Sequence, residues 1–147
     1  MKNHVTRSIA ILGLFFMLAI ASVQAQTPSR VEVNIPFDFS AGKATLKAGA
    51  YNISRASGNA LAIRSVDGKT TALVNAPLTI GSRDSKAGER LVFNQYGDQY
   101  FLAQVWLTVD TGRQLFTSGA ETKAGREYRL AHKDAKPQRV EIAMQAR

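Results

Sequence analysis

The sequence predicts an all-β domain, either a single antiparallel β-sandwich or a small β-barrel, with one short helix in its C-terminal region. Short stretches of alternating apolar and polar residues follow one another, turn-forming residues separate them, and helical spacing appears only late in the chain. Residues 26–147 are expected to form one domain, because their number suits one modest core and no internal repeat of fixed period divides them.

The first 25 residues have the features of a secretory signal peptide. Lys2 and Arg7 precede an uncharged apolar run over residues 9–21, and short side chains stand at Val23 and Ala25, where signal peptidase needs them. We expect cleavage after Ala25 and a protein exported to the periplasm or beyond. The alternative is an uncleaved membrane anchor, although the run is shorter than the about 20 apolar residues that a spanning helix needs.

Composition narrows the function classes. The chain has 19 Lys and Arg against 11 Asp and Glu, and two of these cations lie in the predicted signal peptide, so the mature net charge would be +6. The absence of cysteine excludes disulfides, thiol nucleophiles and a lipid anchor on cysteine, and His132 is the only histidine after the signal peptide. We therefore expect no metal site, no cofactor and no histidine-dependent catalytic triad.

The first predicted strand covers residues 31–40, where apolar and polar residues alternate strictly. Pro36 lacks a ladder donor, which predicts either an edge strand or a break in the strand at that point. Alternation resumes at Tyr51 and Ile53 after Gly49. These segments are typical of strands with one buried face.

A hairpin is predicted next, from Leu61 to Leu78, around Asp67-Gly68. This dipeptide between β-rich runs favours a two-residue type I′ turn, in which both residues have positive φ. Residues 81–90 are polar and contain glycine, so we expect an exposed loop there.

The densest apolar segment predicts a central hairpin of residues 91–96 and 99–109 around Gly97-Asp98, a dipeptide that suits a type II′ turn. A two-residue loop would pair Phe93 with Leu102, Gln95 with Tyr100 and Val92 with Ala103. Both faces would then be apolar and covered. One face would carry Leu91, Phe93, Tyr100, Leu102 and Trp106, and the other Val92, Phe101, Ala103, Val105, Leu107 and Val109.

Ser118-Gly119-Ala120-Glu121 matches a capping box and predicts the start of the helix. Ala120, Ala124, Tyr128 and Ala131 are spaced for its inner face, although Gly125 is a poor helix former. Alternation from Val140 to Met144 predicts a last strand. In total we expect seven or eight strands.

Several of these segments resemble a family of small exported bacterial proteins that have no established activity. They are Ile35-Pro36-Phe37-Asp38-Phe39-Ser40-Ala41-Gly42, Leu46-Lys47-Ala48-Gly49-Ala50-Tyr51, Val92 to Leu102 with its Tyr-Gly-x-x-Tyr-Phe-Leu hairpin, and Ser118 to Glu121. The resemblance covers most of the mature chain. It implies export and a β-rich domain, and it implies no activity and no site residues.

Two short motifs invite an enzymatic interpretation. Asp110-Thr111-Gly112 is similar to the Asp-Thr-Gly of aspartic proteases, so a hydrolase with Asp110 as its carboxylate is the alternative function. Arg113 stands where those enzymes have a small residue, and Asp-x-Gly is also an ordinary turn. Ser40-x-x-Lys43 fits a motif of penicillin-recognising enzymes, but that motif needs a helix start and Ser40 follows a strand pattern.

The basic surplus gives the leading hypothesis, a non-enzymatic exported envelope or binding protein whose partner is an anionic surface, a polysaccharide or another protein. On the predicted helix, Lys123, Arg126, Arg129 and Lys133 would offer a cationic surface, unless they form a solvated face with pairs to Glu127. Nucleic acid is not expected as a partner in that compartment.

The aromatic residues Tyr96, Tyr100 and Trp106 would suit a sugar-stacking platform, or else a core with cross-strand pairs. Trp106 and Tyr100 belong to the face assigned to the core. Tyr96 lies beside the turn and is the one expected to be exposed.

Overall fold

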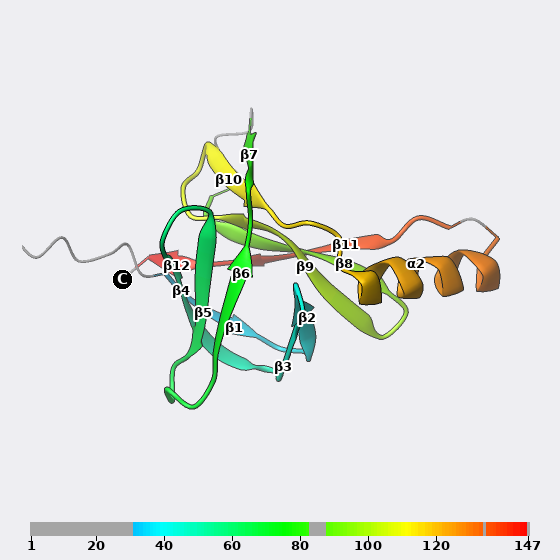
Figure 1. The fold of residues 1–147 in the computed structure, drawn as a ribbon, viewed down its shortest axis with the longest axis horizontal. Helices are drawn as coiled ribbons and strands as arrows, with labels where there is room; N and C mark the ends of the chain where they lie inside the picture. Colours follow the sequence, from blue (N-terminus) through cyan, green and yellow to red (C-terminus); the bar gives the residue numbers. More distant parts are fainter. Residues whose placement is uncertain (1–30, 83–87, 134, 147) are drawn as a thin grey trace, which may run out of the picture.

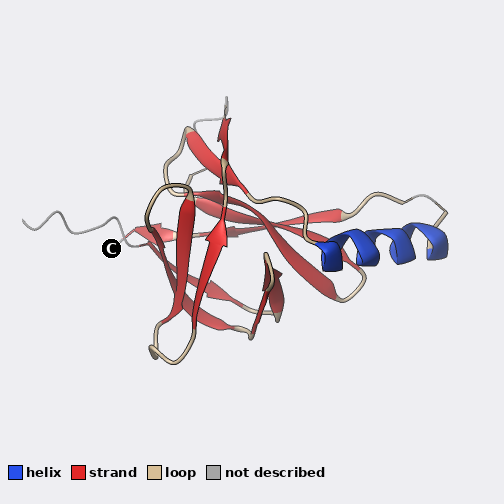
Figure 2. Ribbon diagram, in the orientation of Figure 1, coloured by secondary structure: helices blue, strands red, loops and turns tan. Residues whose placement is uncertain are grey.

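A computed structural model describes residues 31–82, 88–133 and 135–146. The predicted signal peptide at residues 1–25 and most of the predicted loop at residues 81–90 lie outside this part of the chain. Within it, strands dominate and one helix, α2, covers Gly119–Ala131 (Figure 2). The strands are β1 (Val31–Ile35), β2 (Phe39–Ala41), β3 (Ala44–Leu46), β4 (Gly49–Arg55), β5 (Ala60–Ser65), β6 (Thr71–Asn75), β7 (Leu78–Gly81), β8 (Arg90–Tyr96), β9 (Gln99–Trp106), β10 (Thr111–Gln114), β11 (Gln138–Ala143) and β12 (Gln145–Ala146).

The strands form two sheets that are not closed into a barrel, so the all-β prediction is confirmed and the sandwich-like alternative describes it (Figure 1). One sheet has the order β12-β1-β4-β5-β6, and the other runs β11-β8-β9-β10-β7, with β2 and β3 attached through β9. The buried core joins apolar residues of both sheets, among them Ile35, Ile53, Ile63, Leu91 and Phe93. All pairings are antiparallel except the single contact of Ser40 with Phe101.

Pro36 breaks the first predicted strand. β1 ends at Ile35, and the chain re-enters a sheet only at Phe39, as the first strand of the β2–β3 hairpin. β1 itself lies between β12 and β4, so it is not an edge strand. Breaks of this kind, together with short pieces such as β12, raise the strand count to twelve in the described residues, above the predicted seven or eight.

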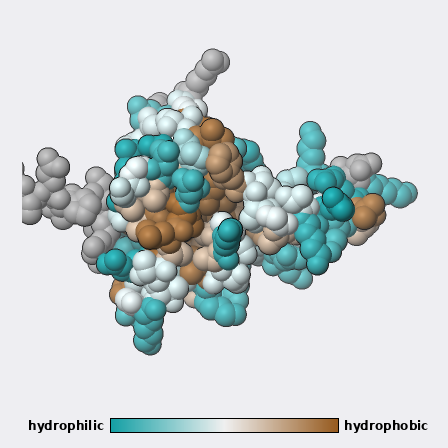
Figure 3. Space-filling view, viewed as in Figure 1, coloured by the Kyte–Doolittle hydropathy of each residue, from teal (hydrophilic) through white to brown (hydrophobic). Residues whose placement is uncertain are grey.

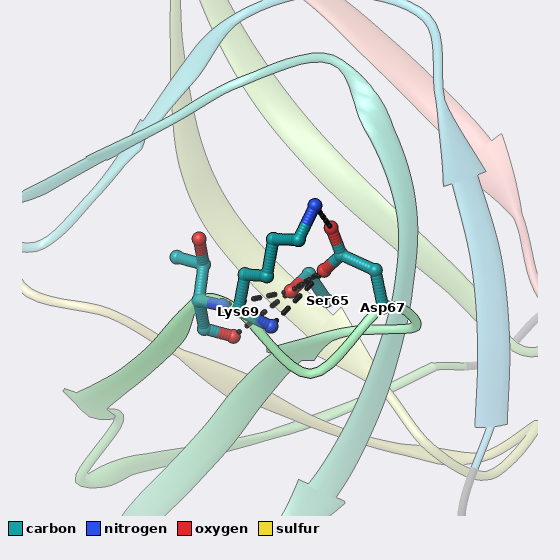
Figure 4. Close-up of polar contacts among 4 residues, drawn as sticks. Ser65, Asp67 and Lys69 are labelled. Atoms are coloured by element: carbon teal, nitrogen blue, oxygen red, sulfur yellow. Dashed lines mark hydrogen bonds and ion pairs between the residues drawn. The ribbon is translucent and has the colours of Figure 1, made fainter.

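The turn around Asp67-Gly68 is longer than predicted. Arg64 pairs with Thr71, and the Ser65 amide donates to the Thr70 carbonyl, which leaves a four-residue loop. Gly68 alone has positive φ, so the type I′ prediction is wrong. The Ser65 hydroxyl donates to Asp67 Oδ1 over 2.6 Å and accepts from the Thr70 amide (Figure 4). These side-chain bonds stabilise the wider loop and hold the pKa of Asp67 below its usual value.

The central hairpin forms as predicted near its turn and departs from the prediction farther out. Gly97 has φ +61° and Asp98 does not have positive φ, as a type II′ turn requires. Phe93 faces Leu102, but a β-bulge between Val92 and Phe93 puts Val92 opposite Gln104, so its predicted pairing with Ala103 is wrong. Because one extra residue reverses the side chains beyond it, Val105 enters the core and Trp106 leaves it.

The helix begins where the capping box predicted, with the Ser118 hydroxyl accepting from the Glu121 amide over 3.1 Å. Its buried face differs from the predicted one. Glu121, Ala124 and Gly125 are buried, whereas Ala120 and Ala131 are exposed. The helix projects beyond the sheets and contacts them through β8 (Figure 1).

Within the described residues the chain passes from one sheet to the other four times, from β1 to β2, from β3 to β4, from β6 to β7 and from β11 to β12. The last two passages connect strands at the margins of the sheets. The chain leaves β6 through Ala76 and Pro77 and pairs again as β7 with β10, and it leaves β11 at Met144 and pairs as β12 with β1. These crossings join the two layers at their margins. β6 is the last strand of its sheet, and it lines one groove together with the β2–β3 hairpin.

Candidate functional site

The four predicted basic residues lie along α2 and its C-terminal end, and all are exposed. At about 100° per residue, Lys123 and Arg126 point away from the buried side of the helix. Arg129 lies at the side of the helix, and its Nη1 is near Gly125. Lys123 has a loose pair with Glu127 at 3.9 Å. Within the described residues, Arg126, Arg129 and Lys133 form no ion pair with a carboxylate.

Glu121 fastens this helix to the sheet. It is the one buried charged residue in the described chain, and its Oε1 accepts from Asn94 Nδ2 over 2.8 Å. The hydroxyl of Tyr96 lies 3.5 Å from the same oxygen. The Glu121 carboxylate therefore accepts hydrogen bonds from β8. Of the two bonds of a capping box, the one from the Glu121 amide to the Ser118 hydroxyl is formed. A carboxylate in the first turn is also favoured by the helix dipole.

Tyr96 is half-buried, so the prediction that it is exposed is wrong. Its ring meets Phe101 and Tyr128 edge-on, at centroid distances of 5.8 and 6.0 Å. A Cβ at Gly125 would lie 3.1 Å from this ring, so the glycine that weakens the helix makes room for the tyrosine. Burial and the neighbouring Glu121 raise the pKa of Tyr96. Tyr96 therefore packs α2 against the sheet.

The other two aromatic residues are also engaged. Tyr100 is half-buried and stacks on Phe37 at 3.8 Å between ring centroids. Trp106 lies on the far side of its sheet from the main core, against Gly112, and the Arg90 guanidinium stands 4.4 Å from its ring centroid. The sequence-based assignment of Trp106 to the core face is therefore wrong. The three residues do not share one platform.

Each of the two enzymatic motifs spans a strand and an adjoining turn or bend. Asp110 is exposed and accepts from the Thr108 hydroxyl, and its carbonyl accepts from the Ser82 amide, which is the geometry of a connection between strands. Ser40 lies within β2, and Gly42 before Lys43 has φ +62°. That strand–turn context lacks the helix start that the Ser-x-x-Lys motif requires.

The surface also has a hollow that the sequence did not predict. It is a groove of about 790 Å³ between β6, the β2–β3 hairpin and the connection from β10 to α2. We call it the β6 groove; it is lined by residues 42–46, 70–75 and 116–119. Its walls include the exposed apolar side chains Leu73 and Phe116. The run Ala72-Leu73-Val74 is the feature of the sequence that could have indicated the groove. A strand with apolar side chains on both faces is expected to be covered on both faces by other protein segments.

No group of three or more potential metal ligands occurs in the described residues. No helix in the same ranges is long and apolar enough to cross a membrane. Comparison with models of protein families, with curated proteins and with solved structures finds no match for this chain. The resemblance to small exported proteins stays a prediction.

Proposed function

We propose that this chain is an exported, non-enzymatic binding protein that attaches to polyanionic envelope material through the outer side of α2. The observation that carries the proposal is the placement of Arg126 and Arg129. Both are exposed on a helix that projects from the sheets, and neither has a carboxylate partner among the described residues (Figure 2). Unpaired guanidinium groups are well suited to bidentate contacts with phosphate or carboxylate.

The way in which α2 is fixed also supports the proposal. Its acidic residue Glu121 is buried against Asn94, and its other acid, Glu127, is the one that pairs with Lys123. The surface that remains is cationic, with exposed Leu130 on the same outer side. A rigid helix that presents several cations at once to an array of anions gains from each contact while losing little freedom.

A double charge reversal tests the helix directly. We expect Arg126→Glu/Arg129→Glu to weaken binding to vesicles of phosphatidylcholine and phosphatidylglycerol by about tenfold or more, because each cation near such a surface contributes about 1 kcal/mol. The same variant should lose binding to the soluble polyanion polygalacturonate if polysaccharide is the source of the anions. Co-sedimentation and fluorescence anisotropy at low salt provide the measurements.

The matched control is Arg55→Glu/Arg64→Glu, which makes the same change in net charge at exposed positions of β4 and β5. This control should bind as the wild type does. Equal losses in both variants would mean that net charge alone attracts the protein and that α2 has no special part. No binding of the wild type to either polyanion would remove the proposed function.

Export has its own test. On expression of the full chain in a bacterial host, we expect the exported fraction to contain a protein that begins at Gln26, since the residues at Val23 and Ala25 suit signal peptidase. Intact-mass spectrometry identifies the cleavage site. Ala25→Arg should leave the precursor uncleaved. A full-length wild-type chain in the membrane fraction would instead indicate the uncleaved anchor.

A further inference from the structure

β6 is an open sheet edge. The amide of Ser65 donates to the carbonyl of Thr70, and the amide of Ala76 donates to the carbonyl of Asn59, so the even-numbered residues of this segment bond to the β5 side. In an antiparallel ladder the alternate residues turn their amide and carbonyl groups the other way. Thr71, Leu73 and Asn75 therefore direct their main-chain groups toward the β6 groove. Within the described residues no strand or side chain bonds to them there.

β6 itself has none of the lysine, proline or bulge that often protects an edge strand. The outward-facing residues of β6 are instead threonine, leucine and asparagine, and Leu73 is 70% exposed. Phe116, 62% exposed, stands in another wall of the same groove. Apolar surface gathers over β6 in the space-filling view (Figure 3).

The groove has the size and the charge for one extended chain. Its edge strand has five residues, which at about 3.3 Å per residue gives a length of about 17 Å. Lys43 is the one charged side chain in its lining, and the first residue of α2, Gly119, lies in the same lining with the positive end of the helix dipole. No acidic side chain lines it.

We propose that the β6 groove binds an extended segment of another protein, with apolar residues and at least one acidic residue, as an added strand on β6. The main-chain groups of Thr71, Leu73 and Asn75 hold the segment in register, as in other cases of strand addition. Leu73 and Phe116 contact its apolar side chains, and Lys43 pairs with its carboxylate. This site is separate from the outer side of α2 and does not depend on the polyanion proposal.

A second copy of this chain fits the groove less well. The β2–β3 hairpin and residues 116–119 stand on the open side of β6, so the edge is recessed between them. Two such edges would have to pass these walls to meet each other. A single extended peptide carries no such flanking segments, so it can reach the recessed edge.

The first experiment defines the ligand by selection. A phage-displayed library of random heptapeptides is panned against the purified protein, and the most enriched peptide is synthesised. We expect enrichment of β-branched or apolar residues together with Asp or Glu. In NMR hydrogen exchange, the amides of Thr71, Leu73 and Asn75 should exchange rapidly in the free protein and become protected when the peptide binds.

Two variants of Leu73 test whether the peptide binds at the edge of β6. Leu73→Pro removes an amide that points away from β5, so the ladder with β5 is kept while the edge loses a donor. Leu73→Lys places an edge-protecting charge at an exposed position and serves if the proline variant does not fold. Each should weaken peptide binding about tenfold or more. Leu130→Lys makes the same leucine-to-lysine change on α2 and should leave binding unchanged.

Four results would overturn the proposal. The first three are an absence of enriched peptides, a selected peptide that binds both Leu73 variants as tightly as the wild type, and protection of the three amides in the free protein. Concentration-dependent dimerisation that Leu73→Lys abolishes would also overturn it, because the occupant would then be a second copy. Polyanion binding is measured in the two Leu73 variants and should not be weakened, so failure of one proposal is distinguishable from failure of the other.

Discussion

Phe93→Ala is expected to lower the free energy of unfolding by about 3–5 kcal/mol, the usual cost of removing a buried phenylalanine ring. Phe93 is 0% exposed in the middle of β8. Its ring meets those of Phe37 and Phe39 edge-on, at 5.2 and 5.5 Å between centroids. The truncation would therefore open a cavity between the central hairpin and the rings of Phe37 and Phe39. Urea unfolding followed by circular dichroism measures the change.

Phe116→Ala is the matched control, since the same atoms are removed from an exposed ring. We expect a change within about 0.5 kcal/mol, the range usual for surface substitutions. Similar losses in the two variants would contradict the assignment of the core to the hairpin and its neighbours. A stable Phe116→Ala protein also serves the peptide-binding test, because Phe116 lines the β6 groove.

Gly112→Ala is expected to destabilise the protein by about 2–3 kcal/mol through overpacking against the indole of Trp106. A Cβ at this position would lie 2.5 Å from Trp106 Cδ2, and 2.8 Å from Cε2 and Cε3. Gly112 pairs with Trp106 across β9 and β10, and the indole is buried, so the ring has little room to retreat. Replacement of glycine in a strand by alanine usually stabilises, so the sign of the effect identifies the clash.

Trp106 is the one tryptophan of the chain, so its fluorescence reports the same event. We expect the emission to shift to the red in Gly112→Ala, as the indole moves toward solvent. Gly81→Ala is the control. It lies on the neighbouring strand β7, and its Cβ would meet the Asp110 carbonyl oxygen at 4.0 Å, an ordinary contact. An unchanged or raised stability in Gly112→Ala would show that the indole yields without cost.

Most of the local structure could be predicted from the sequence. The alternation around Val33 and Ile53, the turn at Gly97 and the capping Ser118 each depend on residues close together in the chain, and each appears in the structure. The turn after Ser65 was mispredicted for a local reason. Asn-Gly and Asp-Gly turns are typed by their central dipeptide, but here the hydroxyl of Ser65 and the carboxylate of Asp67 favour a wider loop.

The candidate sites were harder to predict. The four basic residues of α2 and its C-terminal end were found because exposure of charged side chains on a helix follows from their spacing. The aromatic residues were misjudged, since an aromatic side chain is stable in either a core or a partly open position. The environment of Tyr96 depends on Gly125 and Tyr128, which lie about thirty residues farther along the chain.

Local patterns of residues are enough to predict an all-β protein with one capped helix, the positions of most strands and the residues that carry the positive charge. Periodicity and capping are local properties, so they can be read without knowing the fold. The tertiary structure decided which strands are neighbours. It alone placed the bulge beside Val92 that exchanges Val105 and Trp106 between faces, and it alone left the outer edge of β6 without a pairing strand in the described part of the chain. Both outcomes arise from pairing between strands distant in the chain, which local residue order does not encode.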